Sequence, residues 1–385
     1  MNSLITNSPI WAEIDLEAIR HNLNTVKQLA SDSKVMAVVK ADAYGHGIEK
    51  VAQTLSASGV NYFGVARLSE AVRLRENDIS DPILILGYTP VEAAAELIKY
   101  NLTQTVFSSD YAELLNEKAR ESKQSLKVHI KIDTGMGRLG LSHDCLTSGN
   151  EKSIAQSAVK IAQLSNLETE GIYTHFAASD AADKTSAHRQ LNFFQNITSL
   201  IKEKDITFSL KHAANSAAVI DLPESYLDMV RPGIMLYGLY PSLEVKQRKV
   251  NLKPAMQLKA RIAQIKKVPK GFKVSYGHTY TTAKATSLAT IPLGYADGYR
   301  RELSSCGTVL VGDQKARIVG RVCMDQSVVD VGHIQNVSNG DEVVIIGQQG
   351  SSCISAEKMA HDLGTINYEV VSSVMARVPR VFLGE

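Results

Sequence analysis

The chain lacks several features that would assign it to a specialised class of protein. It has four cysteines, Cys145, Cys306, Cys323 and Cys353, in 385 residues, and they form no C-x-x-C pair. Such wide spacing favours reduced thiols over a disulfide framework or a zinc site, and reduced thiols are typical of the cytoplasm. We therefore expect a cytoplasmic protein that binds no metal.

Long apolar runs and a strong excess of one charge are also absent. No apolar stretch reaches the length that spans a bilayer, and residues 1–7 lack the charged and apolar regions of a secretion signal. The formal net charge is only +2, so neither nucleic acid nor a membrane surface is expected as a partner. With 44% hydrophobic and 21% charged residues the composition is that of a globular protein, and the length predicts two domains.

Short apolar runs alternate with longer amphipathic segments through the first two-thirds of the chain. Strands are predicted at 35–40, 62–66, 82–87, 103–107, 128–133, 170–175, 208–212 and 227–230. Helices are predicted at 48–57, 68–77, 90–100, 109–121, 151–164 and 183–204, with a short piece near 215–221, and Leu16, Ile19, Leu23 and Val26 line one face of an earlier helix. Eight strands alternating with helices favour a closed (β/α)8 barrel of the TIM type over an open sheet.

Strand and turn signals replace this alternation after residue 240. Strands are predicted at 260–266, 287–292, 309–312, 316–322, 327–331 and 342–347, followed by a helix near 355–363. The strand-like segment 10–14 could join this second, mostly-β domain. The predicted domains are therefore an α/β barrel over 1–240 and a β-rich domain over 241–385.

Lys40 stands at the end of the first predicted strand and precedes a loop that contains Gly45 and Gly47. A strand that ends in this way places an amine at the mouth of a barrel. Partial desolvation there lowers the pKa of a lysine and makes its amine a nucleophile or a base. A lysine at the end of a strand is more often one that simply extends into water. Its neighbours in the fold therefore decide between the two interpretations.

Polar residues follow five of the predicted barrel strands at the end where the loops of a barrel converge on one mouth. They are Lys40 and Tyr44 after the first strand, Arg138 after the fifth, His175 at the end of the sixth, Asn215 and Ser216 after the seventh, and Arg231, Gly233 and Ile234 after the eighth. This grouping predicts one functional site at that rim.

The segment 135–140 fits the G-x-G-x-x-G pattern of dinucleotide-binding proteins and does follow a predicted strand. That strand is the fifth of the series, however, whereas the pattern usually opens a nucleotide-binding domain. Residues 141–149 also do not begin a convincing helix. A dinucleotide site is therefore not favoured here.

Seven segments resemble the bacterial alanine racemases, pyridoxal-phosphate enzymes with a barrel and a β-domain. They are Ala37–Gly47, Lys131–Gly140, His212–Ser216, Val230–Ile234, Val274–Gly277, Cys323–Asp325 and Ile366–Glu369. The segments occur in order and cover nearly the whole chain. The resemblance implies that the chain interconverts L- and D-alanine and so supplies D-alanine for peptidoglycan.

By that resemblance, Lys40 carries pyridoxal phosphate (PLP) as an imine and then acts as a base on one face of the substrate. Tyr276 of a partner subunit is the implied base on the other face, which makes a homodimer part of the mechanism. Arg231 is implied to face the pyridine nitrogen, with His212 orienting it. A guanidinium cannot accept a proton from that nitrogen and discourages its protonation, which suppresses side reactions such as transamination.

The resemblance assigns further roles around the cofactor and the substrate. For the phosphate it implies Tyr44, Ser216, Tyr368 and amides near Gly233 and Ile234, and a short helix beginning near Ser216 would add its N-terminal amides. Asn215 is implied as a further cofactor-binding residue. His175 would stack on the pyridine ring. Arg138 would hold the substrate carboxylate or the phenolic oxygen of the cofactor. Lys131 matches a lysine that is often carbamylated in the family, and as an anion it would brace Arg138.

Met324 and Asp325, also from the partner subunit by resemblance, would border the substrate. Asp180, Tyr295 and Arg301 match the entrance corridor of the family. Several of the implied site residues also have an ordinary structural interpretation. Ser216 is suited to cap a helix, Tyr276 and Tyr368 to pack as aromatics, and the corridor residues to lie on an exposed surface.

Two alternative functions remain open from the residues. A barrel-fold PLP-dependent decarboxylase would share the lysine and the layout, but the chain has no Gly-Gly-Gly phosphate loop. Arg231 also disfavours this reaction, because decarboxylation benefits from a strong electron sink. A non-catalytic PLP-binding protein would be a lone barrel, which the residues after 240 and the segment around Tyr276 disfavour.

Overall fold

A computed structural model describes residues 8–142 and 150–384. The predictions for residues 1–7, for Cys145 and for most of the loop 141–149 concern residues outside this described part. The chain divides into two compact units. The barrel unit comprises residues 19–43 and 48–253, and the β-unit comprises 1–18, 44–47 and 254–385.

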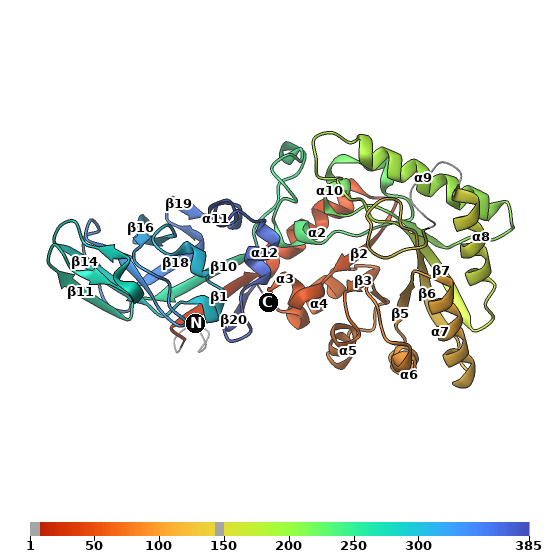
Figure 1. The fold of residues 1–385 in the computed structure, drawn as a ribbon, viewed down its shortest axis with the longest axis horizontal. Coiled ribbons are helices and arrows are strands. Elements are labelled where there is room, and N and C mark those ends of the chain that lie inside the picture. The colour runs from red at the N-terminus through yellow and green to blue at the C-terminus, as the bar shows by residue number, and fades with distance from the viewer. Residues whose placement is uncertain (1–7, 143–149, 385) are drawn as a thin grey trace. The chain divides into compact units, whose positions relative to one another are not determined.

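Eight parallel strands form the sheet of the barrel unit (Figure 1). They are β2 (Lys34–Val38), β3 (Tyr62–Val65), β4 (Ile83–Ile85), β5 (Thr103–Val106), β6 (Leu126–Lys131), β7 (Leu167–Tyr173), β8 (Leu210–His212) and β9 (Met229–Val230). They pair in chain order from β2 to β8, and β9 pairs with β2. Backbone hydrogen bonds from Asp228 to Lys211 and from Arg231 to Ala214 tie β9 to β8 and close the ring. The predicted (β/α)8 barrel is confirmed.

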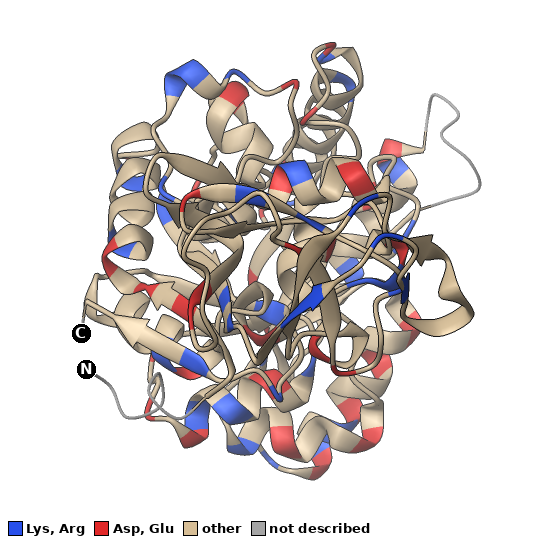
Figure 2. Cartoon of the chain, turned by 90° about the vertical axis from the view of Figure 1, so that its left-hand side faces the viewer, with Lys and Arg blue, Asp and Glu red and all other residues tan. Residues whose placement is uncertain are grey.

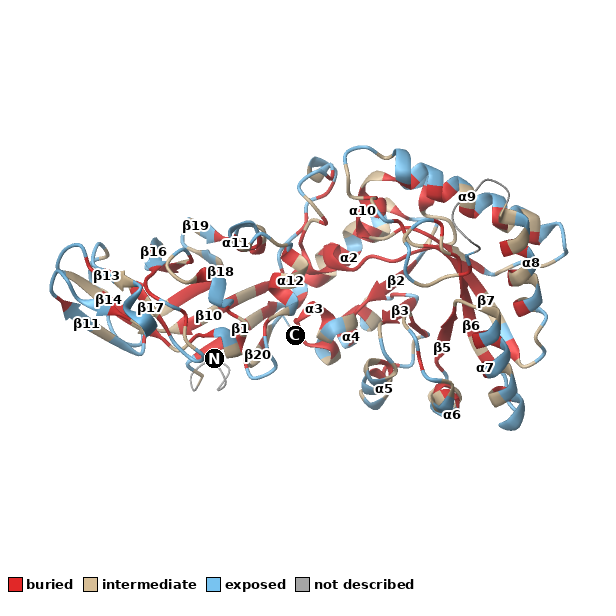
Figure 3. Ribbon diagram, in the orientation of Figure 1, coloured by how far each residue is buried: buried red, intermediate tan, exposed pale blue. Residues whose placement is uncertain are grey.

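Helices follow the strands, as the alternation predicts. They are α2 (Leu16–Leu29) before the first barrel strand, then α4 (Ile48–Ala57), α5 (Leu68–Glu76), α6 (Ala94–Lys99), α7 (Ser109–Glu121), α8 (Glu151–Ala162), α9 (Thr185–Lys202) and α10 (Ser216–Asp221). Figure 3 shows buried residues along the barrel strands and exposed residues on the outer faces of α7, α8 and α9. The predicted apolar face of α2 is buried at all four positions. Burial of one apolar face is what stabilises these helices.

The first six predicted barrel strands end one or two residues earlier in the structure, and two of these ends affect the site. β2 ends at Val38, so Lys40 stands two residues beyond it, and β7 ends at Tyr173, so His175 follows the strand rather than ending it. After Tyr173 the carbonyl of Thr174 accepts a hydrogen bond from the guanidinium of Arg231 at 2.7 Å. The amide of Thr174 still donates to the carbonyl of His212, so the chain leaves β7 at the residue whose carbonyl bonds to a side chain.

The β-unit is built on a mixed sheet. Its strands are β1 (Ile10–Asp15), β10 (Met256–Arg261), β11 (Gln264–Val268), β14 (Thr286–Ile291), β15 (Thr308–Val311), β16 (Gln314–Ile318), β17 (Ser327–Asp330), β18 (Glu342–Gln349), β19 (Ser352–Ile354) and β20 (Arg380–Leu383). β1 pairs antiparallel with β10 and parallel with β20. The strand-like segment 10–14 therefore lies in the sheet of the β-unit.

One strand prediction in the β-unit is wrong. The predicted strand at 260–266 is the end of β10 and the start of β11, with a break at Ile262 and Ala263. The amide of Ile262 donates to the carbonyl of Asp341, whereas the amide of Ala263 donates to Thr290. The chain changes its pairing partner at this point, and an apolar pattern does not record such a change.

Several short elements of the β-unit are missing from the predictions. They include β19, β20, the hairpin of β12 (Lys273–Val274) and β13 (Tyr280–Thr281), and helix α12 (Asn367–Ser372), which follows α11 (Ala356–Leu363). The hairpin matters for the site because its loop carries Tyr276. Two-residue strands give no period that a sequence pattern could reveal.

Charges of both signs are interspersed along the helices and strands, as expected for a net charge of +2 (Figure 2). Among the described residues, none of the helices combines the length and the apolar character needed to cross a bilayer.

Candidate active site

Lys40 opens an unusual turn at the rim of the barrel. The four residues after it, Ala41 to Tyr44, all have positive φ values between 53° and 55°. Non-glycine residues rarely adopt this conformation, because Cβ then crowds the backbone at a cost of about 1–2 kcal/mol per residue. Such strain persists only where the surroundings hold it in place.

Glu70 on α5 is one of the groups that hold this turn. Its Oε1 accepts the amide of Ala41 at 2.6 Å, and its Oε2 accepts the amides of Ala66 and Arg67 at 2.8 and 3.1 Å. One carboxylate therefore joins the loop after β2 to the loop after β3. Glu70 was not among the predicted site residues, because a glutamate in the first turn of an amphipathic helix resembles an ordinary exposed residue.

The amine of Lys40 lies in a cationic environment. Burial lowers its pKa, the charge of Arg138 lowers it further, and Glu70 opposes this effect. Lys131 is similar, because burial and then Arg138 and Arg231 lower its pKa to about 8. Such a cluster of fixed positive charge favours anionic ligands and keeps a neighbouring amine nucleophilic.

Arg138 sits in a loop that is shaped by Asp133. The carboxylate of Asp133 accepts the backbone amides of Gly135, Met136, Gly137 and Arg138 at 2.8–3.1 Å. A Cβ on Gly140 would lie 2.4 Å from the backbone nitrogen of Asp133. The glycines therefore allow a tight loop around a carboxylate. Because that carboxylate already occupies the amides, the G-x-G-x-x-G pattern is not a phosphate cradle here.

Arg231 is buried at the rim and its donors are used on several sides. Nη1 lies 2.9 Å from Nδ1 of His212, which places these two predicted partners in direct contact. Nη2 donates to the carbonyls of Thr174 and Ala213 at 2.7 and 3.0 Å and lies 3.3 Å from Nδ1 of His175. Burial lowers the pKa of Arg231 to about 10, so the guanidinium stays charged at neutral pH. Burial and then Arg231 hold the pKa of His175 well below its ordinary value.

The loops after β8 and β9 are held together by Ser216. Its hydroxyl oxygen accepts the amide of Gly233 at 2.8 Å. Helix α10 begins at Ser216, as predicted, and Asn215 caps it by accepting the amide of Ala218 at 3.1 Å. Asn215 also accepts the Ser179 hydroxyl at 2.8 Å. Asn215 therefore has a clear structural role beside the predicted one.

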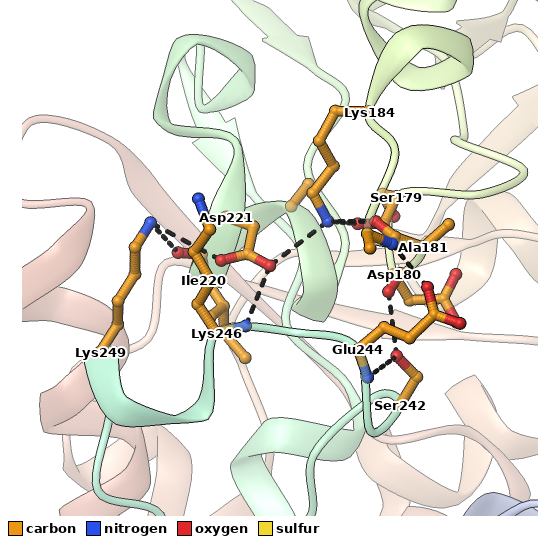
Figure 4. A network of polar contacts seen from close by, with 12 residues as sticks. Ser179, Asp180, Ala181, Lys184, Ile220, Asp221, Ser242, Glu244, Lys246 and Lys249 are labelled. Atoms are coloured by element: carbon orange, nitrogen blue, oxygen red, sulfur yellow. Dashed lines mark hydrogen bonds and ion pairs between the residues drawn. The ribbon is translucent and has the colours of Figure 1, made fainter.

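A network of polar contacts ties residues 241–249 to the loop after β7 (Figure 4). The carboxylate of Asp221 is buried and lies 3.3 Å from Nζ of Lys184 and 3.6 Å from Nζ of Lys249. The backbone carbonyl of Asp180, a predicted entrance residue, accepts the Ser242 hydroxyl at 2.9 Å. The network positions the loop that carries Asp180, and the sequence analysis missed Asp221 because its partners are distant in sequence.

In the β-unit, an open hollow brings together Tyr276, Met324 and Asp325. The side chain of Tyr276 is 71% exposed and that of Met324 is 53% exposed. Arg377 holds Asp325 through a contact of 2.7 Å and also contacts the buried Asp297 at 2.9 Å. Three residues that were predicted to reach a partner subunit therefore share one exposed face of the β-unit.

The remaining predicted residues of the β-unit lie on loops and short helices. The rings of Tyr44 and Tyr368 are 6.1 Å apart, so the structure brings two predicted phosphate ligands together. The glycine after Tyr44 is required, because a Cβ on Gly45 would lie 2.2 Å from the carbonyl oxygen of Val371. Tyr295 and Arg301 begin two separate 3-10 turns and are both exposed.

Both units match models of one protein family. The model described as "Alanine racemase, N-terminal domain" matches residues 14–241, and "Alanine racemase, C-terminal domain" matches residues 255–382. The chain belongs to the alanine racemase family. Members of this family are PLP-dependent isomerases.

Individual relatives agree with this assignment over nearly the full length. The alanine racemase of Desulforamulus reducens is 50% identical over 377 residues, which cover 98% of this chain and 99% of the relative. The structure of alanine racemase from Clostridium difficile 630 is 42% identical, with a TM-score of 0.91 and coverage of 98% and 96%. That of alanine racemase from Bartonella henselae, described with covalently bound pyridoxal phosphate, is 30% identical, with a TM-score of 0.86 and coverage of 98% and 100%.

Proposed function

We propose that the chain is an alanine racemase that interconverts L- and D-alanine, acts in the cytoplasm and supplies D-alanine for peptidoglycan. The observation that carries this proposal is the amine of Lys40, which has a lowered pKa and lies among fixed cations at the barrel rim. The match of both units to one family supports it.

The residues at this rim fit PLP. Lys40 would carry the group, and its anionic parts suit the cationic environment. The residues proposed to hold it are Lys40, Tyr44, His175, Asn215, Ser216, Arg231, Gly233, Ile234 and Tyr368. Bound PLP supplies an electron-withdrawing ring conjugated to the substrate nitrogen, which acidifies the proton on the α-carbon. The donors of Arg231 offer the pyridine nitrogen hydrogen bonds but no proton acceptor.

Two bases are needed because racemisation exchanges a proton on opposite faces of one carbon. Lys40 serves one face, since burial and Arg138 favour its neutral amine. Tyr276 of a partner subunit serves the other face, and Arg138 holds the substrate carboxylate. Met324 and Asp325 from the same partner border the substrate methyl group. The homodimer is supported by the exposed hollow around Tyr276, because large exposed side chains are typical of interaction surfaces.

Lys131 is proposed to be carbamylated. With a pKa of about 8 its amine is partly neutral at physiological pH, and a neutral amine is the form that reacts with carbon dioxide. The product is an anion, which Arg138 and Arg231 would stabilise. Intact-mass measurement under non-acidic conditions should show the added carbamate in the parent chain but not in Lys131→Met. Equal masses of the two chains, after correction for the substitution, would contradict the proposed carbamylation.

The test of the shared site uses two inactive variants. Tyr276→Phe should lower the rate from L- to D-alanine by about 10²–10⁴-fold and still bind PLP covalently, because the phenol acts only in proton transfer. Lys40→Ala should lose covalent attachment and activity. Mixed dimers of the two variants should regain part of the activity, because one of the two sites then holds both bases.

Tyr280→Phe is the matched control, since Tyr280 lies in the same hairpin as Tyr276 and packs in an apolar cluster. It should keep the parent rate. An unchanged L-to-D rate in Tyr276→Phe would remove Tyr276 from its role. Release of carbon dioxide from amino acids would indicate the decarboxylase, and bound PLP without turnover would indicate the non-catalytic binding protein.

A further inference from the structure

The interior of the barrel unit holds a continuous series of hydrogen-bonded polar side chains, which we call the interior chain. Nη1 of Arg231 lies 2.9 Å from Nδ1 of His212, and Nε2 of His212 lies 2.9 Å from Nδ1 of His129. Nε2 of His129 lies 3.3 Å from Oε2 of Glu170, which also accepts the Tyr62 hydroxyl at 2.8 Å. His129, Glu170 and Tyr62 are absent from the predicted site.

The interior chain extends from one end of the barrel to the other. Arg231 directly follows β9, at the rim where Lys40 lies. At the opposite end, Tyr62 and Thr103 are the first residues of β3 and β5, and their hydroxyls are 2.7 Å apart. Both histidines are fully buried, whereas the side chain of Glu170 is 25% exposed and reaches solvent. A charge near the amino-terminal end of the strands is therefore connected to the catalytic rim.

Two local features of β7 make room for this arrangement. The register between β6 and β7 shifts at His129, so that Val128 pairs with Thr169, His129 pairs with Gly171, and Glu170 is an extra residue. Such a bulge re-aims a side chain that strict alternation would place on the other face. Gly171 leaves space for the imidazole, because a Cβ there would lie 2.7 Å from the His129 ring.

The two ends of the interior chain determine the tautomer of each histidine. Arg231 has only donors, so Nδ1 of His212 must accept and its Nε2 must carry the proton. That proton is donated to Nδ1 of His129, which leaves the proton of His129 on Nε2. The carboxylate of Glu170 is the acceptor that this last proton requires. From Arg231 through His212 and His129, every donor then points toward Glu170, which also accepts the Tyr62 hydroxyl from the other side.

Both imidazoles are neutral in this scheme, and their surroundings agree with it. Burial and then Arg231 hold the pKa of His212 well below its ordinary value. Burial also lowers the pKa of His129, against the opposing effect of Glu170. The hydrogen bond from His129 lowers the pKa of Glu170, which keeps it ionised. In a buried region, aligned hydrogen bonds polarise one another, so the charge of Glu170 strengthens Nδ1 of His212 as an acceptor.

We infer that Glu170 is a positioning residue for racemisation, which sets the tautomers of His129 and His212 and thereby holds Arg231 toward the cofactor nitrogen. The inference rests on the proposed function. With the reverse tautomer, an N–H of His212 would face an N–H of Arg231, and the guanidinium would lose a buried partner. Residues at this end of a barrel are ordinarily assigned to stability alone.

The decisive measurement is made on Glu170→Gln. An amide is a weaker acceptor than a carboxylate and can turn its own N–H toward His129. Solid-state ¹⁵N NMR of histidine-labelled holoenzyme should show Nδ1 of both buried histidines unprotonated in the parent. In Glu170→Gln the resonances of His129 should change, and those of His212, which does not touch residue 170, should change with them.

Kinetics give a second readout. Glu170→Gln should lower kcat by about 3- to 10-fold, the effect of exchanging a charged for a neutral hydrogen bond. KM for alanine should stay at the parent value, because Glu170 contacts neither the substrate nor the residues proposed to bind it. A residue that only stabilises the fold would alter the amount of active enzyme and leave the histidine resonances of the folded fraction unchanged.

A second variant breaks the interior chain without removing a polar group. Gly171→Ala places a methyl group against the His129 ring and should lower kcat in the same way. The double variant should be no worse than the more impaired single variant, because both act through one series of contacts. Glu168→Gln, at an exposed position of the same strand, is the matched control and should retain the parent kcat and spectrum.

The opposite tautomer in the parent would overturn the inference. So would a change confined to His129, or an unchanged kcat in both Glu170→Gln and Gly171→Ala. Because the tautomers are measured without turnover, these results are independent of whether the substrate is alanine. Absence of racemisation together with the expected tautomers would remove the proposed function, and with it the catalytic consequence assigned to Glu170.

Discussion

The two units present their proposed catalytic groups in opposite ways. In the barrel unit, burial and the charges of Arg138 and Glu70 act on the amine of Lys40. Arg231 is buried and donates to the carbonyls of Thr174 and Ala213. In the β-unit, Tyr276 stands on an exposed loop in an open hollow. A buried electrostatic site can fix protonation states by itself, whereas an exposed phenol needs further surroundings to become a base.

The backbone shows the same contrast. Strain in the barrel unit is concentrated in the turn after Lys40, which Glu70 holds by a hydrogen bond. In the β-unit, Ser275 and His278 flank Tyr276 with positive φ values of 61° and 49°. There the Ser275 hydroxyl donates to the carbonyl of Arg321 at 2.6 Å. Both proposed catalytic side chains thus lie in or beside strained loops, but they differ greatly in burial.

Among variants that keep both proposed bases, the largest effect is expected from Arg231→Ala in the buried site. Removing the guanidinium should lower racemisation by about a thousandfold, because it leaves His212 and two carbonyls without their buried partner. Transamination, measured as pyruvate formed per D-alanine, should rise relative to racemisation. Arg231→Lys should not restore the parent behaviour, since an ammonium cannot reach all these acceptors in one plane. Parent activity in either variant would contradict the importance of the buried cation.

An effect of intermediate size is expected for Lys131 on the free energy of unfolding, because the cations close to it in the barrel unit oppose folding. Unmodified Lys131 has a pKa of about 8 in the folded chain, against 10.5 for a free side chain. Between these pH values the unfolded chain binds more protons, so the stability of the parent rises with pH in this window. At pH 7, Lys131→Met should therefore be more stable than the parent by up to about 3 kcal/mol, and this advantage should disappear by pH 10.5.

Urea unfolding of cofactor-free protein in carbonate-free buffer measures this difference. Lys127→Met is the control, because Lys127 lies on the same strand and is only half-buried. Its difference from the parent should be small. A stability gap for Lys131→Met that stays constant from pH 7 to pH 10.5 would contradict the lowered pKa.

The smallest effect is expected from the exposed ion pair of the β-unit. Arg377→Met frees the carboxylate of Asp325, and the KM for alanine should rise by about two- to fivefold, the range typical of exposed ion pairs. The effect should fade at high salt, unlike that of Arg231→Ala, because exposed charges are screened. Steady-state kinetics at two ionic strengths measure the rise in KM and its dependence on salt. A loss of activity in Arg377→Met as large as that in Arg231→Ala would contradict the view that the hollow around Tyr276 is an exposed site.

Much of the fold was predictable because its signals are local. The eight barrel strands and most helices follow from runs and periods of a few residues, and the polar residues at the strand ends follow from the strand positions. The contact of Arg231 with His212 was predicted from the family resemblance. The functional carboxylates were not predictable, because Glu70, Asp133, Glu170 and Asp221 each contact groups that lie elsewhere in the sequence or that depend on a loop conformation.

Particular errors show where local patterns fail. The end of β7 was placed two residues too late, because the sequence does not show that Arg231 takes the carbonyl of Thr174. The strand at 260–266 was not divided, because both of its halves are apolar although they pair with different strands. The role of Glu170 depends on a bulge in β7. The one extra residue changes the face of the sheet to which a side chain points, and the amino-acid composition of the strand does not reveal this.

By itself, the sequence determined which candidate site residues follow the barrel strands, because strand ends and glycine loops are recognised from adjacent residues. Only the tertiary structure decided their chemical state. The pKa of Lys131, the tautomers of His129 and His212 and the left-handed turn after Lys40 all depend on charges and hydrogen bonds from distant segments. Such interactions act over a few ångströms in space, irrespective of separation along the chain.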